Sequence, residues 1–267
     1  MDTSTALYLT MLIPTLAMAG NMVWKNQENL RDGITFICAV LTFACVLVIL
    51  CNVGNDTTGP YELFDVVSGL SISFHVEPLG LMFAIIGSGL WIITHIYGVG
   101  YMRGNNEQHH ARFFACFSIA IAAVMGIAFA SNMFTLFVFY EILTLSTYPL
   151  VAHKGTPEAV KGARTYLSIL IGTSIALLLT GVIWTFTIAG TLDFTKGGIL
   201  EGKIAPTLLP VLLGLYAFGI GKAALMPFHR WLPAAMVAPT PVSALLHAVA
   251  VVKAGVFSML KVGIYIF

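Results

Sequence analysis

Eight apolar stretches, each long enough to cross a lipid bilayer, dominate this chain. A helix needs about 20 apolar residues to span the hydrocarbon core, where its backbone groups must be paired within the segment. The stretches cover residues 5–23, 33–53, 79–100, 112–130, 133–151, 166–190, 206–232 and 241–267. Only 9% of the 267 residues are charged, whereas soluble domains carry about 25%. The pattern predicts an all-α integral membrane protein with about eight transmembrane helices and no soluble catalytic domain.

Basic residues are concentrated in alternate loops. If the N-terminus is outside, the outside loops hold only Lys196 and Lys203. The inside loops then hold Lys25, Arg31, Arg103, Arg112, Lys154, Lys161, Arg164 and Arg230. The positive-inside rule therefore predicts a multi-pass protein of the cell membrane with its N-terminus outside. The net charge of +1 gives no reason to expect a nucleic-acid partner.

One outside segment has the periodicity of a β-strand. Apolar and polar residues alternate over residues 70–76, which favours a strand. Ser68 and Gly69 supply a turn that would fold this strand back on residues 62–67. We predict a short β-hairpin at the outer membrane surface.

Three charged residues lie near the middle of apolar stretches. Glu141 is in the fifth stretch, Lys222 in the seventh and Lys253 in the eighth. A charged side chain at the bilayer centre costs about 2.5–3.5 kcal/mol on insertion scales, and such residues usually mark ion or proton pathways. We therefore expect a proton relay, in which Glu141 and Lys222 form an ion pair that can break.

Prolines and histidines adjoin the lysines. Pro227 follows Lys222 and predicts a helix break soon after that lysine. His229, near the inner end of the broken helix, is either a proton uptake or release group or a cap for freed carbonyls. His247 precedes Lys253 by six residues, so the two share a face only if the helix is distorted; bridging water could still make His247 part of the relay. His109, His110 and His153 lie in polar loops and are expected to be solvated.

The sequence contains no pattern for chemistry within this chain. We find no phosphate loop, nucleophile elbow, haem or iron–sulfur motif. The four cysteines lie in apolar stretches without metal-ligand spacing. No cofactor, metal site or catalytic residue is predicted. Any enzymatic role would belong to a larger cation/proton antiporter or redox-driven translocase.

The C-terminal third resembles a known family. PFHRWLPAAMVAPTPVSALLHAVAVVKAG is similar to the signature of the antiporter-like subunits of respiratory complex I, multi-subunit cation/proton antiporters and membrane-bound hydrogenases. FVFYEILTLSTYPL resembles the glutamate-bearing fifth helix of this family, and GIGKAALMPFHRWLP its broken seventh helix. The resemblance extends from about Glu77 onward. It implies that Glu141 and Lys222 gate a half-channel, with His247 and Lys253 as relay residues.

The resemblance also predicts a division of the chain. Members of this family have about fourteen helices, including two inverted five-helix repeats. Residues 1–110 would form three helices with the hairpin, and residues 111–267 the first repeat. The expected partners are other membrane subunits, including a chain that supplies the second repeat. The transported ion would be H⁺, with Na⁺ undecided.

Two other functional classes stay open at this point. The chain could be a structural or assembly subunit, or an inactive truncated fragment, in which the charges only hold the bundle together. An independent transporter of an organic solute is a weaker alternative, because nothing resembles a substrate pocket. A neighbouring reading frame that encodes the missing helices would favour the proton-translocating subunit.

Overall fold

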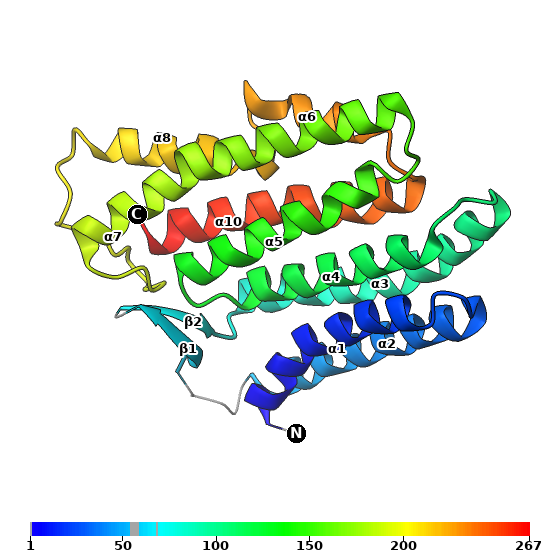
Figure 1. Ribbon diagram of the computed structural model, residues 1–267. Coiled ribbons are helices and arrows are strands. Elements are labelled where there is room, and N and C mark those ends of the chain that lie inside the picture. The colour runs from blue at the N-terminus through cyan, green and yellow to red at the C-terminus, as the bar shows by residue number, and fades with distance from the viewer. Residues whose placement is uncertain (1, 54–58, 68) are drawn as a thin grey trace.

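The computed structural model describes residues 2–53, 59–67 and 69–267. The described residues form a layered bundle of long helices, with a two-stranded hairpin at one end (Figure 1). Seven helices are long and apolar enough to cross a membrane within this part of the chain. The chain is thus a multi-pass, all-α membrane protein, as predicted.

Four helices form one side of the bundle. They are α1 (Thr3–Val23), α2 (Glu28–Asn52), α3 (Pro78–Gly104) and α4 (His110–Phe129). Helix α4 packs against α1, α3 and α5, and nearly all of its residues are buried. Small residues make this central position possible. A Cβ atom on Gly126, for example, would lie 2.2 Å from a ring atom of Phe139.

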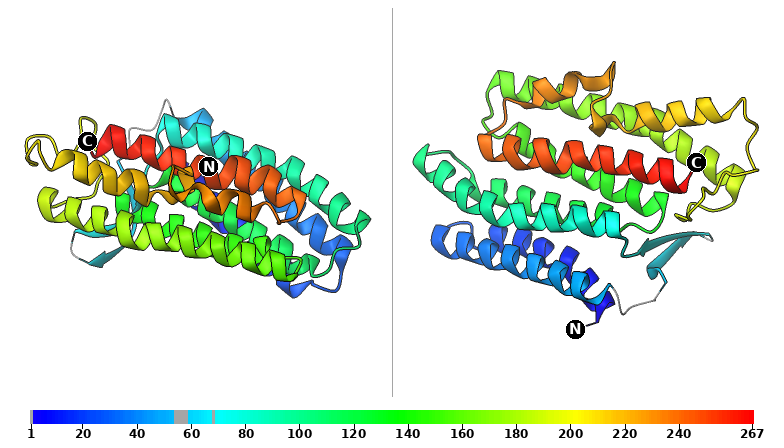
Figure 2. Two further views of the ribbon diagram at one scale, coloured as in Figure 1. Left: turned by 90° about the horizontal axis from the view of Figure 1, so that it is seen from above. Right: turned by 180° about the vertical axis from the view of Figure 1, so that it is seen from behind.

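The second side consists of α5 and the segments that follow it. Helix α5 spans Met133–Val151, and a long helix follows as α6 (Pro157–Thr173), a π-helical turn (Ser174–Leu178) and α7 (Leu179–Ala189). Next come α8 (Leu209–Gly219), 3₁₀ turns at Gly221–Ala223 and Phe228–Arg230, and α9 (Trp231–Ala235). The chain finishes with a π-helical segment (Val242–Val251) and α10 (Val252–Tyr265). From one side of the bundle to the other, the layers are α1/α2, α3/α4, α5/α10 and α6–α7/α8 (Figures 1 and 2).

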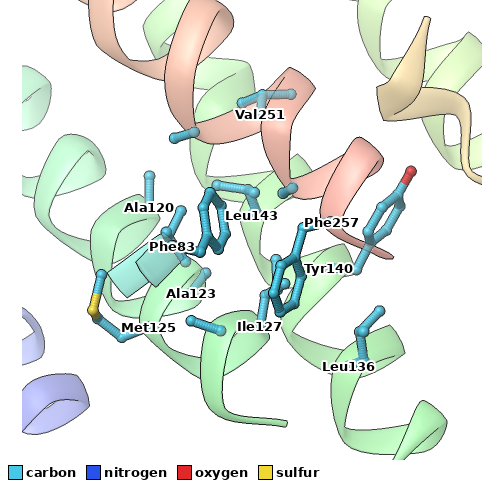
Figure 3. Close-up of a cluster of buried hydrophobic side chains, with 14 of the residues drawn as sticks. Phe83, Ala120, Ala123, Met125, Ile127, Leu136, Tyr140, Leu143, Val251 and Phe257 are labelled. Atoms are coloured by element: carbon cyan, nitrogen blue, oxygen red, sulfur yellow. The ribbon is translucent and has the colours of Figure 1, made fainter. Parts of the chain in front are cut away.

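One hydrophobic core runs across these layers. Phe83 of α3 stacks on Phe257 of α10, with ring centroids 5.0 Å apart. Figure 3 shows these rings beside Ala123 of α4 and Leu143 of α5. The same cluster of buried residues includes members of α1 and of α8. The division at residue 110 therefore stays a prediction, because the core does not stop there.

The hairpin has the predicted strands. Strands β1 (Tyr61–Val67) and β2 (Leu70–Phe74) are antiparallel, with Tyr61 opposite Phe74 and Val67 opposite Leu70. The predicted turn residue Ser68 lies outside the described residues. The N-cap residue of α5 holds the hairpin on the bundle: the amide of Asn132 donates to the carbonyl of Ser71 (2.9 Å) and to the hydroxyl of Ser73 (2.8 Å).

Two helix boundaries differ from the predictions by more than five residues. The sixth helix begins at Pro157 rather than at residue 166, because Thr156 caps it and proline fits its first position. Its first turns carry charged residues, so hydropathy alone placed the start too late. The seventh helix ends at Gly219, before Lys222 and well before Pro227. Pro227 lies in the irregular segment but does not cause its start.

The two ends of the bundle differ in charge. The hairpin, both termini and the connection from α7 to α8 lie at one end, which we call the hairpin end (Figure 1). The turns joining α1 to α2, α3 to α4 and α5 to α6 lie at the other. We call this the basic end, because these turns and the adjacent helix ends carry Lys25, Arg31, Arg103, Arg112 and Lys154.

Candidate ion-pathway site

Lys222 is completely buried between α5 and α10. Its amine donates hydrogen bonds to the backbone carbonyl of Tyr140 (2.7 Å) and to the hydroxyl of Thr144 (2.5 Å). The amine also lies 3.1 Å from the centre of the Tyr140 ring. Among the described residues no carboxylate is in ion-pair contact with it. A buried lysine is therefore held here by neutral oxygens and an aromatic face.

The backbone around Lys222 is unwound and is paired by other parts of the fold. The N–H of Lys222 donates to the hydroxyl of Tyr140 (3.0 Å), and the indole N–H of Trp231 donates to the carbonyl of Gly221 (2.8 Å). Such substitute bonds are what permits non-helical backbone at membrane depth. Ala224 then takes a left-handed conformation, with φ 55°.

Close approaches explain why the helix ends where it does. A Cβ atom on Gly219 would lie 2.4 Å from the backbone nitrogen of Leu178, at the end of the π-helical turn. On the other side, a Cβ atom on Gly255 of α10 would lie 2.3 Å from the backbone nitrogen of Ala223. The unwound segment thus sits tightly between two neighbouring helices. The local sequence shows only the glycines and not the packing that requires them.

Glu141 lies next to this lysine but does not touch it. Both of its carboxylate oxygens are buried and accept no well-aligned hydrogen bond from the described residues. Ser174, in the π-helical turn, and the charge of Lys222 are its electrostatic neighbours. The predicted Glu141–Lys222 ion pair is therefore not formed in this structure. Single π turns inside helices occur often at functional sites, and this one adjoins the carboxylate.

Polar side chains continue from Lys222 toward the basic end. Thr144 contacts the amine, and Thr147, one turn further along α5, donates to the carbonyl of Thr144 (3.0 Å). The Thr147 hydroxyl also bonds the hydroxyl of Tyr166 on α6 (2.5 Å). All three side chains are buried. Sequence reasoning singled out neither Thr144 nor Tyr166, since isolated hydroxyls are common in transmembrane helices.

The other predicted residues lie apart from Lys222. Lys253 is exposed on the surface of α10, and His229 is exposed in the turn before α9. His247 lies in the π-helical segment, and its side chain is outside the described residues. The helix is π-helical over Val242–Val251 and is thus distorted between His247 and Lys253; the relay role of these two residues stays a prediction.

A second buried lysine was not predicted. Lys261 of α10 is fully buried near the hairpin end and lies 3.0 Å from a carboxylate oxygen of Glu77, at the start of α3. Its amine also donates to the carbonyl of Ala130 (2.8 Å). The pair joins α10 to α3 and to the α4–α5 turn. The sequence did offer one indication of its burial, because Lys261 lies two helical turns beyond Lys253 in the same apolar stretch.

The prediction that His109, His110 and His153 are solvated is wrong for His153. His153 is buried, with 5% of its surface exposed, and its ring packs edge-on against Phe113 at 5.2 Å. Burial and the neighbouring charge of Arg112 lower the pKa of His153 to about 4. The polar sequence around it concealed this burial, because the turn after α5 folds back over α4.

Two family profiles match the chain. The family described as NADH:quinone oxidoreductase/Mrp antiporter, TM, matches residues 130–267. The family described as NADH-Ubiquinone oxidoreductase (complex I), chain 5 N-terminus, matches residues 66–114. The first match contains the whole region around Lys222, and the second contains β2, α3 and the start of α4.

Curated relatives agree with these profiles. A putative antiporter subunit mnhA2 of Staphylococcus haemolyticus is 33% identical over 241 residues, which are 88% of this chain and 30% of that protein. The chloroplastic NAD(P)H-quinone oxidoreductase subunit 5 of Ipomoea purpurea is 27% identical over 268 residues, which are 94% of this chain and 37% of that protein. The chain thus spans about a third of the length of these two relatives.

Solved structures have the same fold. The Mrp complex from Dietzia sp. matches with a TM-score of 0.82 and 25% identity over 97% of this chain and 28% of that one. The archaeal membrane-bound sulfane sulfur reductase matches with a TM-score of 0.81 and 22% identity over 97% of this chain and 52% of that one. The long profile match and the agreement in fold lead to one assignment: the chain belongs to the NADH:quinone oxidoreductase/Mrp antiporter family of transmembrane proteins.

Proposed function

We propose that this chain forms the first proton-translocating half of an antiporter-like membrane subunit. The subunit works within a multi-subunit ion-pumping complex of the cell membrane, with its N-terminus outside. Relatives are named as an antiporter subunit and as quinone oxidoreductase subunits, and two of the solved relatives are membrane complexes. The residues around Lys222 support the same function independently.

The observation that carries the proposal is the burial of Lys222 without a carboxylate in contact. A nearby carboxylate favours the charged form of an amine, and its withdrawal favours release of the proton. Glu141 is close enough for its charge to act on Lys222, yet its oxygens are free of strong partners. Movement of Glu141 toward and away from Lys222 would therefore alternately load and unload the amine.

The buried hydroxyls indicate the side of Lys222 to which its proton passes. Thr144, Thr147 and Tyr166 connect the amine to the part of the bundle nearer the basic end. Hydroxyl groups both donate and accept hydrogen bonds, so they can pass a proton along a chain with water. We assign this track to proton exchange between Lys222 and the basic end. We assign His229, exposed in the turn before α9, as a proton uptake or release group of this path.

Lys253 indicates where the path continues. It lies on an exposed stripe of α10 that is otherwise apolar and includes Val256, Leu260 and Ile264. A lone lysine facing lipid is costly at this depth. We infer that a second repeat, from the same or another polypeptide, covers this stripe. Lys253 and His247 then pass protons from Lys222 into that second half.

Proton flux in proteoliposomes tests this function. The intact complex is purified from its native membrane in mild detergent, reconstituted, and assayed with a pH-sensitive dye. Lys222→Met removes the exchangeable proton and should reduce flux by more than about tenfold, as expected for loss of a proton-transfer group. Lys196→Met, at an exposed position of the hairpin end, is the matched control and should leave flux unchanged.

The structural and assembly alternative makes a different prediction. If the charges only hold the bundle together, Lys222→Met would reduce the amount of assembled complex, and the complex that remains would pump normally. Mass spectrometry of the purified complex measures assembly and identifies the partners. A variant complex with all its subunits and normal flux would refute the proposed relay.

A further inference from the structure

A second, separate site lies at the basic end, on the side of the bundle away from Lys222. A cavity of about 690 Å³ opens among the ends of α1, α2, α3 and α4. Its lining includes the basic and titratable residues Lys25, Arg31, Arg103, His109, His110 and Arg112. The proton relay uses none of them.

The arginines in this cavity are held in place. One carboxylate, that of Asp32, is 2.8 Å from the guanidinium of Arg31 and 2.5 Å from that of Arg103. Arg31 is only 2% exposed, so its guanidinium cannot swing away into solvent. Each guanidinium carries five N–H donors. One shared carboxylate therefore leaves donors available toward the cavity.

Charge in the cavity favours an anion. Its lining contains four lysines or arginines against two carboxylates, Glu28 and Glu107. Asp32, behind the two arginines, reduces the excess to one positive charge. Glu28 faces His110 at 3.7 Å and Glu107 faces His153 at 3.9 Å, so both carboxylates have cationic or polar neighbours of their own.

The start of α4 adds to the positive potential. His109 occupies the N-cap position with φ 60°, its side chain does not cap the helix, and no acidic residue lies in the first turn. His110, Ala111 and Arg112 line the cavity, and the N–H groups of a first turn have no partner within the helix. In the described chain, Nε2 of His110 is also buried without a hydrogen-bond partner.

The surroundings of the cavity point to a lipid. Met22 lines it, and the neighbouring Val23 and Trp24, at the end of α1, are exposed by 70% and 39%. Tryptophan favours the level of the lipid headgroups, and the ends of membrane-crossing helices lie at that level. A soluble anion would not need an apolar border, whereas the acyl chains of a phospholipid would lie along it.

We propose that this cavity binds the phosphate of an anionic phospholipid. The Arg31–Asp32–Arg103 cluster and Arg112 form its inner wall, the first turn of α4 points N–H groups at the phosphate, and Lys25 closes its rim. Basic pockets between transmembrane helices bind acidic headgroups in this way. The lipid would thereby fasten the ends of α1 to α4 together.

Lipid retention in nanodiscs tests the proposal. The intact complex is placed in phosphatidylcholine nanodiscs with or without added phosphatidylglycerol, and native mass spectrometry counts the retained lipids. Phosphatidylglycerol should be retained in preference to phosphatidylcholine. Lys25→Gln should weaken this retention about fivefold, since one basic residue near a membrane surface contributes about 1 kcal/mol. Lys25 is exposed and makes no hydrogen bond or ion pair with the described residues, so its loss should leave folding intact.

Controls separate the sources of phosphate and exclude a general charge effect. Lys154→Gln removes an exposed lysine from the same end but outside the cavity and should not change retention. Tens of millimolar inorganic phosphate should not displace the lipid. Displacement would instead identify a soluble phosphate as the ligand of the same site. Equal retention of both lipids, or equal effects of the two substitutions, would overturn the proposal.

Discussion

Tyr140 makes three separate contacts with Lys222. Its carbonyl accepts from the lysine amine at 2.7 Å, its ring centre lies 3.1 Å from that amine, and its hydroxyl accepts from the lysine N–H at 3.0 Å. Tyr140 precedes Glu141 in the same helix. Tyr140 anchors the unwound segment. It thus adjoins Glu141, the carboxylate that we propose exchanges protons with Lys222.

Replacement of Tyr140 by phenylalanine tests this anchoring. The Tyr140→Phe variant keeps the ring but leaves the buried N–H of Lys222 without its acceptor. Such a loss costs about 1–3 kcal/mol in free energy of unfolding. Thermal unfolding of the complex in detergent should show a lower midpoint. Tyr97→Phe, at an exposed ring on α3, should leave it unchanged; equal midpoints for both variants would contradict the anchoring role.

Gly255 should tolerate no side chain. In Gly255→Ala, the new methyl group would lie 2.5 Å from the carbonyl carbon of Lys222, and backbone cannot move aside as a flexible side chain can. We expect about 1–3 kcal/mol of destabilisation, as for other overpacked interiors. Gly263→Ala, on the same helix with no atom within 4 Å of the added methyl group, is the control. Both variants gain helix propensity, so only the close packing distinguishes them in thermal unfolding.

The buried Lys261–Glu77 ion pair should stabilise the folded protein. In Glu77→Gln the buried ammonium loses its counter-charge, and breaking a buried pair on one side costs about 3–5 kcal/mol. The double variant Glu77→Gln/Lys261→Met should recover part of this loss. Glu28→Gln removes a carboxylate that is 56% exposed and lies 3.7 Å from His110, and it should cost less than about 1 kcal/mol. A double variant as unstable as Glu77→Gln would show that the charge pairing is not the cause.

His153 predicts a dependence of stability on pH. Its pKa in the folded protein is about 4, whereas an unfolded histidine has a pKa of about 6.5. Between these values the unfolded chain binds a proton that the folded chain does not, so stability falls as the pH falls through this window. Arg112, His109 and His110 act against protonation, and Glu107 lies 3.9 Å away. His153→Asn should flatten the pH dependence of the unfolding midpoint, whereas His229→Asn should not.

Much of the fold follows from hydropathy and local pattern. The apolar stretches and the alternation in residues 70–76 predict the helices and the hairpin, because both patterns reflect short-range geometry. The position of the helix break does not follow in this way. Pro227 is the strongest local breaker, yet the helix ends at Gly219, where tertiary bonds from Tyr140 and Trp231 replace helical ones.

Only part of the candidate site could likewise be predicted from local sequence. The cost of a buried charge identified Lys222 and Glu141 from their position in apolar stretches. It could not show that Lys222 is held by Tyr140 and Thr144 rather than by Glu141, nor that Lys253 faces outward. Lys261 and His153 depend on contacts between segments far apart in the sequence, and one sequence carries no record of such contacts.

The exchange of protons between Glu141 and Lys222 is most directly tested by proton flux in the Glu141→Gln variant. The substitution keeps the size and polarity of the side chain but removes its exchangeable charge. In the reconstituted intact complex, flux should fall by at least about tenfold, while Glu201→Gln, at an exposed position, keeps the normal rate. Normal flux in a fully assembled Glu141→Gln complex would contradict the proposed relay.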